Sequence, residues 1–410
     1  MKRLVLLSGL LAVLAVPARA ATTSTPLGAL RELPSPAAPG SGEPALAVAP
    51  GGAVWMSWLE PRAAGGHALK LAKLEGRRWS RPRTVAEGDS FFVNWADFPA
   101  LVAVTAKHLA ASWPWKRPGG TYAYDVRLAQ SGDGGATWSA PLTPHRDGVA
   151  TEHGFVSLAA EAGSVRAVWL DGRNAESAPK TPEGEAEEGA FDMTLRTALV
   201  DAQGGLSDER ELDARTCECC QTGLVETARG ALVAWRDRSA DEVRDMHLAR
   251  RDGDRWSDPY PLHPDGWKIA GCPVNGPALD AAGDRVAVAW FTSVADTPRV
   301  FAALSSDGGA SFGEPARVDD GTPKGRVDVT LLADGAALVL WLEEGQEEAL
   351  VRLRRIGRDG VAGEAATIAS TSGARASGFP RMARSGGRLV LAWTEAGRPS
   401  RIRAAELKLR

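Results

Sequence analysis

The sequence has few residues of several reactive types and no surplus of charge. Its 410 residues include 3 tyrosines, 4 cysteines, 5 methionines and 6 histidines, and the formal net charge is -3. A chain without a strong positive charge lacks the electrostatic attraction on which nucleic-acid binding depends. After residue 20, no apolar run is long enough to cross a membrane as a helix. We therefore expect no nucleic-acid partner and no transmembrane segment in the mature chain.

The first twenty residues have the composition of a secretory signal peptide. Met1-Lys2-Arg3 is basic, residues 4–16 are apolar, and the stretch ends with Ala18-Arg19-Ala20. A basic start, a short apolar core and an Ala-x-Ala exit are the three parts of such a peptide. This pattern predicts a signal peptide over residues 1–20, a mature chain over residues 21–410, and a periplasmic or secreted location.

One short pattern recurs along the mature chain: a Gly-bearing turn, a few apolar residues and then a tryptophan. The seven copies end at Trp58, Trp113, Trp169, Trp235, Trp290, Trp341 and Trp393, with spacings of 55, 56, 66, 55, 51 and 52 residues. Such spacing indicates repeated supersecondary units, and each unit holds short strands bounded by Gly, Asp and Pro turns. The sequence therefore predicts an all-β propeller of seven blades, each of four antiparallel strands, with these tryptophans in the core of a single domain.

The last unit, residues 379–409, supplies only three strands. Residues 29–33, near the start of the mature chain, form a candidate fourth strand. A blade assembled from both ends of the chain leaves no open sheet edge at the seam of the ring. We therefore predict that the N-terminal strand closes the last blade.

Two turns follow one pattern of serine, aspartate, paired glycines and an aromatic residue. They are Ser131-Gly132-Asp133-Gly134-Gly135-Ala136-Thr137-Trp138 and Ser305-Ser306-Asp307-Gly308-Gly309-Ala310-Ser311-Phe312. An aspartate in such a turn accepts backbone N–H bonds, and glycine adopts conformations closed to other residues. We interpret Asp133, Trp138, Asp307 and Phe312 as structural residues.

These turns resemble the Asp-box, or bacterial neuraminidase repeat, and the mature chain resembles the sialidase-like propeller superfamily. The resemblance implies glycan chemistry and offers six blades, as in the family's sialidases, as the alternative to seven. Those enzymes hold a sugar carboxylate with three arginines and use an aspartate as acid/base and a Tyr–Glu nucleophile. Their opening Arg-Ile-Pro-Ala-Leu corresponds here to Gly42-Glu43-Pro44-Ala45-Leu46, and Tyr122, Tyr124 and Tyr260 all precede the last blades. We therefore expect no sialidase activity.

All four cysteines lie in two segments that lead into the fourth and fifth units. The segments are Cys217-Glu218-Cys219-Cys220 and Gly271-Cys272-Pro273-Val274-Asn275-Gly276-Pro277. They resemble segments of uncharacterised exported sialidase-like bacterial proteins, a resemblance that supplies no function. Because equivalent loops of adjacent blades lie side by side, all four cysteines can meet at one point.

The cysteines allow three interpretations. In an oxidising compartment, an even number of cysteines favours disulfides, here with Cys272 linked to the segment from Cys217 to Cys220. Thiolates also bind soft metals, with Cu(I) the candidate, whereas the spacing matches no standard zinc finger. The third interpretation is a set of unpaired or redox-active thiols.

Charged and aromatic residues are concentrated in the predicted loops around the channel mouth. Arginine can hold a carboxylate or sulfate through paired hydrogen bonds, and aspartate with histidine can transfer protons. The alternative is a network of ion pairs that only holds the loops together. The ligand-binding candidates are Asp97, Trp113, Trp115, His153, Asp171, Arg173, Arg236, Asp237, Arg238, Arg244, Arg326 and Arg381.

These observations lead to three functional hypotheses. The first is a propeller that binds or hydrolyses a glycan, or binds another small anionic ligand, at the channel mouth. The second is a copper or redox protein that uses the four cysteines, and the third is an interaction scaffold for a partner protein. The Glu-, Pro- and Gly-rich residues 175–190 are expected to form a surface loop.

Overall fold

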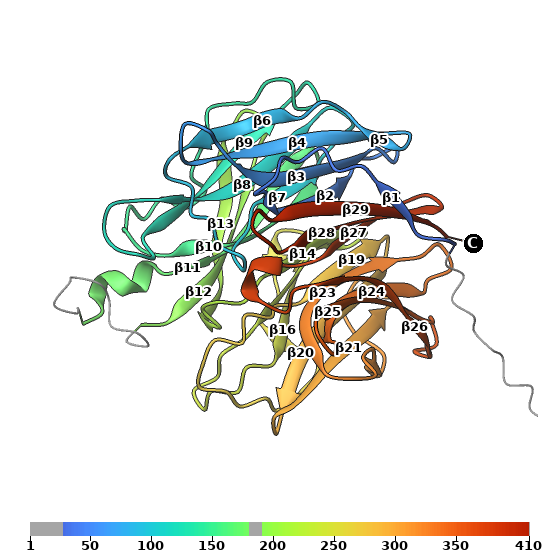
Figure 1. Ribbon diagram of the computed structural model, residues 1–410. Helices are drawn as coiled ribbons and strands as arrows, with labels where there is room; N and C mark the ends of the chain where they lie inside the picture. The colour runs from blue at the N-terminus through green and yellow to red at the C-terminus, as the bar shows by residue number, and fades with distance from the viewer. Residues whose placement is uncertain (1–27, 180–190, 410) are drawn as a thin grey trace, which may run out of the picture.

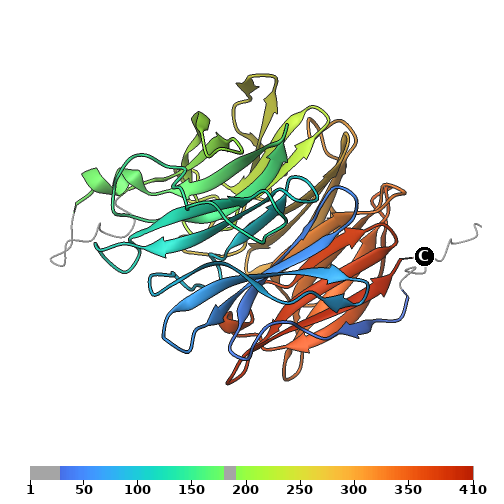
Figure 2. The same ribbon diagram turned by 90° about the horizontal axis from the view of Figure 1, so that it is seen from above.

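The computed structural model describes residues 28–179 and 191–409, which form a ring of seven antiparallel sheets (Figures 1 and 2). The predicted seven-bladed propeller is confirmed, and the six-bladed alternative is wrong. The predicted signal peptide lies outside the described residues, as do residues 180–190 of the predicted surface loop. Among the described residues, no helix has both the length and the apolar character needed to span a bilayer.

The first three blades follow one another along the chain. Blade one contains β2 (Gly42–Val48), β3 (Val54–Pro61), β4 (His67–Glu75), β5 (Arg78–Trp79) and β6 (Arg83–Gly88). Blade two contains β7 (Ala100–Ala103), β8 (Leu109–Lys116) and β9 (Tyr124–Ser131). Blade three contains β10 (His153–Glu161), β11 (Ser164–Asp171), β12 (Met193–Val200) and β13 (Leu206–Thr216), with a short 3-10 helix, η1 (Arg173–Ser177), after β11. Blade two thus differs from the prediction of four strands, because a single bridge between Leu128 and Leu142 replaces its outer strand.

The remaining blades complete the ring. Blade four contains β14 (Gly223–Thr227), β15 (Gly230–Arg236), β16 (Met246–Asp252), β17 (Arg255–Trp256) and β18 (Tyr260–Pro261). Blade five contains β19 (Ala278–Ala282), β20 (Arg285–Val294), β21 (Thr297–Ser305) and β22 (Ala316–Arg317). Blade six contains β23 (Pro323–Leu331), β24 (Ala337–Glu344), β25 (Ala349–Ile356) and β26 (Ala362–Thr371), followed by the 3-10 helix η2 (Arg375–Ser377). Blade seven contains β27 (Arg381–Ser385), β28 (Arg388–Glu395) and β29 (Arg401–Lys408).

The N-terminal strand closes the ring. Strand β1 (Arg31–Leu33) pairs antiparallel with β29, and Leu33 lies opposite Ala404 (Figure 1). The Leu33 side chain is buried against blades seven and one, and Glu32 forms an ion pair with Arg403. The predicted closure by strands from both ends of the chain is confirmed.

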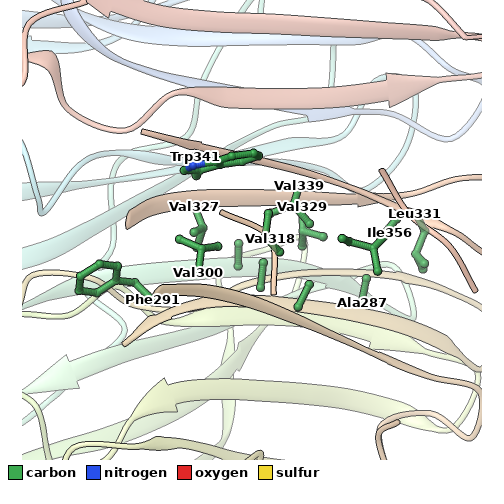
Figure 3. Packing of buried hydrophobic residues seen from close by; sticks show 14 of the residues in the cluster. Ala287, Phe291, Val300, Val318, Val327, Val329, Leu331, Val339, Trp341 and Ile356 are labelled. Atoms are coloured by element: carbon green, nitrogen blue, oxygen red, sulfur yellow. The ribbon is translucent and has the colours of Figure 1, made fainter. Parts of the chain in front are cut away.

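The hydrophobic core consists of separate clusters at the interfaces between neighbouring blades. Side chains on a strand alternate between the two faces of its sheet, so each central strand contributes to two interfaces. In β20, Val288 and Trp290 pack toward blade four, whereas Ala289 and Phe291 pack toward blade six. Figure 3 shows the latter interface, where blade six contributes Val327, Val329, Leu331, Val339, Trp341 and Ile356.

The seven repeated tryptophans are buried, as predicted. Three donate the indole N–H to the acid two residues later, at 2.8–3.0 Å, in the pairs Trp58–Glu60, Trp169–Asp171 and Trp341–Glu343. Two donate to an acid of the preceding blade, at 2.7 and 2.8 Å, in the pairs Trp235–Asp213 and Trp290–Asp265. A tryptophan thus fills the interface while a carboxylate satisfies its one polar atom.

The two Asp-box turns are held by their own side chains. Asp133 accepts hydrogen bonds from the backbone N–H groups of Ala136 and Thr137 at 2.9 Å, and Asp307 accepts one from Ser311 at 3.0 Å. Gly135 has a φ of +78°, and a Cβ there would lie 2.5 Å from Leu71 of blade one. The Asp-box turn of blade two therefore packs against blade one, and its residues shape the turn for this contact.

We predict that a comparison of Trp341 with Trp113 separates the contribution of the Trp341 hydrogen bond to stability from the contribution of its packing. Both rings are buried at the same repeat position, but Trp113 Nε1 has no hydrogen-bond partner among the described residues. Trp341→Phe leaves the buried Glu343 carboxylate without its donor, so it should lower the free energy of unfolding by about 1–3 kcal/mol more than Trp113→Phe. Urea unfolding followed by circular dichroism measures the difference, and equal losses would contradict the role of the carboxylate.

Candidate functional site

Residues 94–98 cross the channel mouth, and we call them the capping segment. The Asn94 side chain shapes the segment by accepting the Ala96 N–H at 2.8 Å. Ala96 O accepts a hydrogen bond from Gln221 of the loop before blade four, and Asp97 Oδ1 accepts one from the backbone of Phe155 in blade three, at 2.7 and 2.8 Å.

The aromatic side chains of the capping segment reach the opposite side of the ring. The Trp95 ring stacks on the Phe379 ring, with 6.1 Å between the ring centroids. The Arg326 guanidinium lies 4.6 Å from the centre of the Trp95 ring. Phe98 lies 5.3 Å from Phe379, centroid to centroid. The segment therefore contacts blades three, four, six and seven, and it covers the central channel on this face.

A cavity of about 460 Å³ occupies the channel. All seven inner strands line it, together with Asp97 and Phe98 of the capping segment. The volume is in the range of small-molecule sites in proteins. Its titratable lining residues are Asp97, Asp280, Asp328, Arg381 and Arg384.

Two of these carboxylates connect neighbouring inner strands. Asp280 accepts the backbone N–H of Leu331 at 2.7 Å, and Asp328 accepts that of Met382 at 2.7 Å. Burial raises the pKa of both groups, that of Asp328 to about 6. Their hydrogen bonds tie blade five to blade six and blade six to blade seven.

Asp97 differs from these two residues, because only one of its carboxyl oxygens accepts a hydrogen bond of good geometry among the described residues. Oδ1 accepts the Phe155 N–H, whereas buried Oδ2 has no partner of good geometry within the described part of the chain. The nearby Tyr124 hydroxyl donates instead to Glu152 Oε1 at 2.8 Å. Burial raises the pKa of Asp97 to about 7 and that of Glu152 to about 8. Asp97 can therefore hold a proton near neutral pH.

Arg381 is a cation without a committed acceptor. Its guanidinium carbon lies 4.3 Å from the centre of the Phe98 ring and 5.7 Å from that of Phe379. Among the described residues it makes no hydrogen bond or ion pair, and the charge of Asp328 acts on it from a longer distance. Burial lowers the pKa of Arg381, yet the side chain lines the cavity and is only half-buried.

Two of the predicted arginines, Arg236 and Arg326, donate mainly to backbone carbonyls. Arg236 is buried and donates to the carbonyls of Asn275, Arg244 and Phe291 at 2.6–3.0 Å. Arg326 donates to Ala374 O, Ser377 Oγ and Gly378 O, at 2.7–3.1 Å, and so fixes the segment around η2. These contacts hold loops together, as the alternative to ligand binding describes, and as ligand-binding residues Arg236 and Arg326 stay predictions.

A buried network lies between blades two and three and involves three of the predicted residues. Arg173 binds Asp171 at 2.7 Å, and His153 Nε2 lies 3.3 Å from Asp147. His145 stacks on His153 at 3.8 Å between ring centroids. Although burial opposes the change, hydrogen bonds from the two histidines hold the pKa of Asp147 below its ordinary value.

This network places acid and histidine ligand atoms close enough for a metal ion, in the groups Asp125–His145–His153 and Asp147–His153–Asp171. Arg173 also contacts Asp147, at 3.4 Å, so a guanidinium already neutralises the acids. We therefore interpret the cluster as a structural network. His145 and Asp147 were missed by the sequence analysis, and their closeness to Glu152 and His153 along the chain was the available signal.

The remaining predicted residues also lie in loops or interfaces. Trp113 is buried in the core between blades one and two, and Trp115 packs edge-on against Phe91. Asp237 lies 3.7 Å from His247, and burial raises its pKa to about 6. Arg238 and Arg244 both pair with Glu218 and Glu242. As ligand-binding residues, all of these stay predictions.

The four cysteines come together beside the capping segment, and all are free. Cys217 Sγ lies 2.7 Å from Cys220 Sγ and 3.9 Å from Cys219 Sγ, and Cys272 lies within interaction range of Cys219. Burial opposes ionisation, but hydrogen bonds from Cys219 and Cys220 and the charge of Arg236 lower the pKa of Cys217. The predicted disulfide to Cys272 stays a prediction.

The fold is a β-propeller with distant structural similarity to sialidases, polysaccharide lyases and an arabinofuranosidase. No protein-family model and no curated protein matches the sequence.

Three solved structures illustrate the similarity. The polysaccharide lyase Uly1 superposes with a TM-score of 0.52 at 10% identity, over 90% of this chain and 90% of that one. A protein of unknown function from Dyadobacter fermentans gives 0.49 at 14% identity, over 93% and 95%. The NanB sialidase from Streptococcus pneumoniae gives 0.44 at 12% identity, over 94% and 71%. At these identities the likeness concerns the fold alone.

We predict that Asp97 makes stability depend on pH. In the folded protein this carboxyl keeps its proton up to about pH 7, whereas in the unfolded chain it ionises near pH 4. Its protonated form therefore contributes stability at low pH that is lost as the pH rises from about 4 to about 7. Asp97→Asn should remove this loss. The melting temperature of the variant minus that of the wild type should therefore rise between about pH 4 and about pH 7, and it should stay constant above that range.

The control for this experiment is Glu347→Gln, which changes an exposed carboxylate. Thermal unfolding of the three proteins between pH 4 and pH 9 gives the comparison. Parallel curves for the wild type and Asp97→Asn would show that Asp97 ionises normally in the folded protein.

Proposed function

We propose that the central cavity binds an acidic sugar, and that Arg381 binds its carboxylate or sulfate group. The observation that carries this proposal is the uncommitted guanidinium of Arg381 in the cavity wall. Guanidinium groups bind carboxylates and sulfates through two parallel N–H···O bonds. Two aromatic rings contact Arg381, and its N–H donors make no hydrogen bond among the described residues, so these donors are available to a ligand.

The carboxyl groups of the cavity favour a ligand that also carries hydroxyls. Asp97 lines the cavity, and a ligand hydroxyl there could form a hydrogen bond with its carboxyl group. Because burial raises the pKa of Asp97 to about 7 and of Asp328 to about 6, both are less anionic at neutral pH than ordinary aspartates. Asp97 in particular is only partly ionised at neutral pH, and it therefore repels an acidic ligand less than an ordinary aspartate would. A sugar acid offers hydroxyls and one anionic group together, whereas a simple anion offers the charge alone.

Asp97 is the group in this cavity best suited to transfer a proton if the bound sugar is a substrate. A general acid or base works best when its pKa is near the working pH, and burial brings Asp97 into that range. We place this site in an exported protein, in keeping with the predicted signal peptide.

Arg381→Met tests the proposal, because methionine keeps the packing against Phe98 and Phe379 but lacks the charge. Affinity for a glucuronate-containing oligosaccharide should fall by about 10- to 100-fold, since hydrogen bonds to a charged group contribute about 1.5–3 kcal/mol. Arg381→Lys should retain part of the affinity. Isothermal titration calorimetry, with carboxylated, sulfated and neutral oligosaccharides, measures these effects.

Arg401→Ala is the matched control, since it removes an exposed arginine from β29 of the same blade. It should bind like the wild type. Equal binding of acidic and neutral oligosaccharides, or unchanged binding by Arg381→Met, would overturn the proposal.

A further inference from the structure

The four cysteines come from two loops that join consecutive blades. Cys217, Cys219 and Cys220 lie between β13 and β14, and Cys272 lies between β18 and β19. The sulfur atoms of the first three all lie within 4.8 Å of one another. Cys217 and Cys220 are buried, Cys219 is half-buried, and Cys272 is exposed, so the group runs from the surface into the protein.

The sulfur atoms of Cys217, Cys219 and Cys220 form one cluster. Cys217 Sγ lies 2.7 Å from Cys220 Sγ and 3.9 Å from Cys219 Sγ, and Cys272 on the other loop lies within interaction range of Cys219. A disulfide joins one sulfur to one other, whereas a metal ion gathers several sulfurs around one point. Three sulfurs within 4.8 Å of one another, with Cys272 next to them, therefore fit a shared centre.

Two arginines supply positive charge next to this cluster. Arg244 Nη1 lies 3.5 Å from Cys217 Sγ, and Arg244 is itself buried. Arg236 is fixed by backbone carbonyls, and its charge also acts on Cys217 and Cys220. Several thiolates around a monovalent cation carry net negative charge, which buried guanidinium groups can offset.

We propose that Cys217, Cys219, Cys220 and Cys272 bind one Cu(I) ion. Thiolates are soft ligands that select Cu(I), and the Cys-x-Cys-Cys spacing differs from that of structural zinc sites. The exposed Cys272 gives the ion access from solvent, and the buried pair Cys217 and Cys220 then shields it from water. This site is separate from the acidic-sugar site, so either proposal can fail without the other.

The test titrates the reduced protein with Cu(I) under anaerobic conditions, against the chromogenic chelator bathocuproine disulfonate. The wild type should withdraw one equivalent of Cu(I) from the chelator. Cys219→Ser and Cys272→Ser should each weaken this binding at least tenfold. Ser239→Ala, a change in the nearby loop between β15 and β16, should leave it unaltered.

Thermal unfolding separates one shared site from unspecific capture by thiols. An ion held by both loops ties blade four to blade five, so Cu(I) should raise the melting temperature of the wild type. In Cys272→Ser, which keeps three thiols on one loop, the increase should be lost. Circular dichroism of each variant establishes that it has folded.

Several outcomes would overturn the proposal. The first outcome combines two results. Mass spectrometry of unreduced peptides, from protein isolated from its native compartment, finds Cys272 linked to the segment from Cys217 to Cys220, and the reduced protein leaves Cu(I) on the chelator. Another is Cu(I) binding that is unchanged by Cys272→Ser. Retention of Zn(II) in the presence of excess Cu(I) would also reject the copper assignment.

Discussion

Apolar packing between neighbouring blades is the interaction on which the rest of this structure depends. Each sheet is buried on both faces, and the side chains of a central strand such as β20 alternate between two interfaces. No blade can bury both faces without two neighbours, so the ring must close. The short β1 strand achieves this by pairing with β29, although its pairing with that strand covers only three residues.

The closed ring leaves backbone polar groups without strand partners at its centre. The inner strands have an edge that faces the channel, where backbone N–H groups lack a strand partner. Asp97, Asp280 and Asp328 act as partners by accepting N–H groups from the inner strand of the next blade. Their raised pKa values follow from this buried position. A carboxyl suited to proton transfer thus arises where the architecture needs a hydrogen-bond acceptor.

The sequence predicted what is local and repeated, and it failed on what depends on distant partners. The tryptophan spacing gave the number of blades, because each repeat contains its own strands and turns. The roles of the arginines depend on contacts that no spacing reveals. Arg326 binds carbonyls near residue 375, and Arg381 rests on Phe98, which belongs to blade two's leading segment. Similar sequence contexts therefore gave one arginine that fixes a loop and one that faces a cavity.

The capping segment connects the two candidate sites. Gln221 directly follows Cys220, and its side chain donates to Ala96 O of the capping segment at 2.7 Å. The same side chain accepts the N–H of Gly276, in the segment that carries Cys272, at 3.0 Å. A Cβ on Gly276 would lie 1.9 Å from Gln221 O, so the two loops pack without spare room. Whatever fixes the cysteines therefore also fixes the segment that covers the cavity beside Arg381.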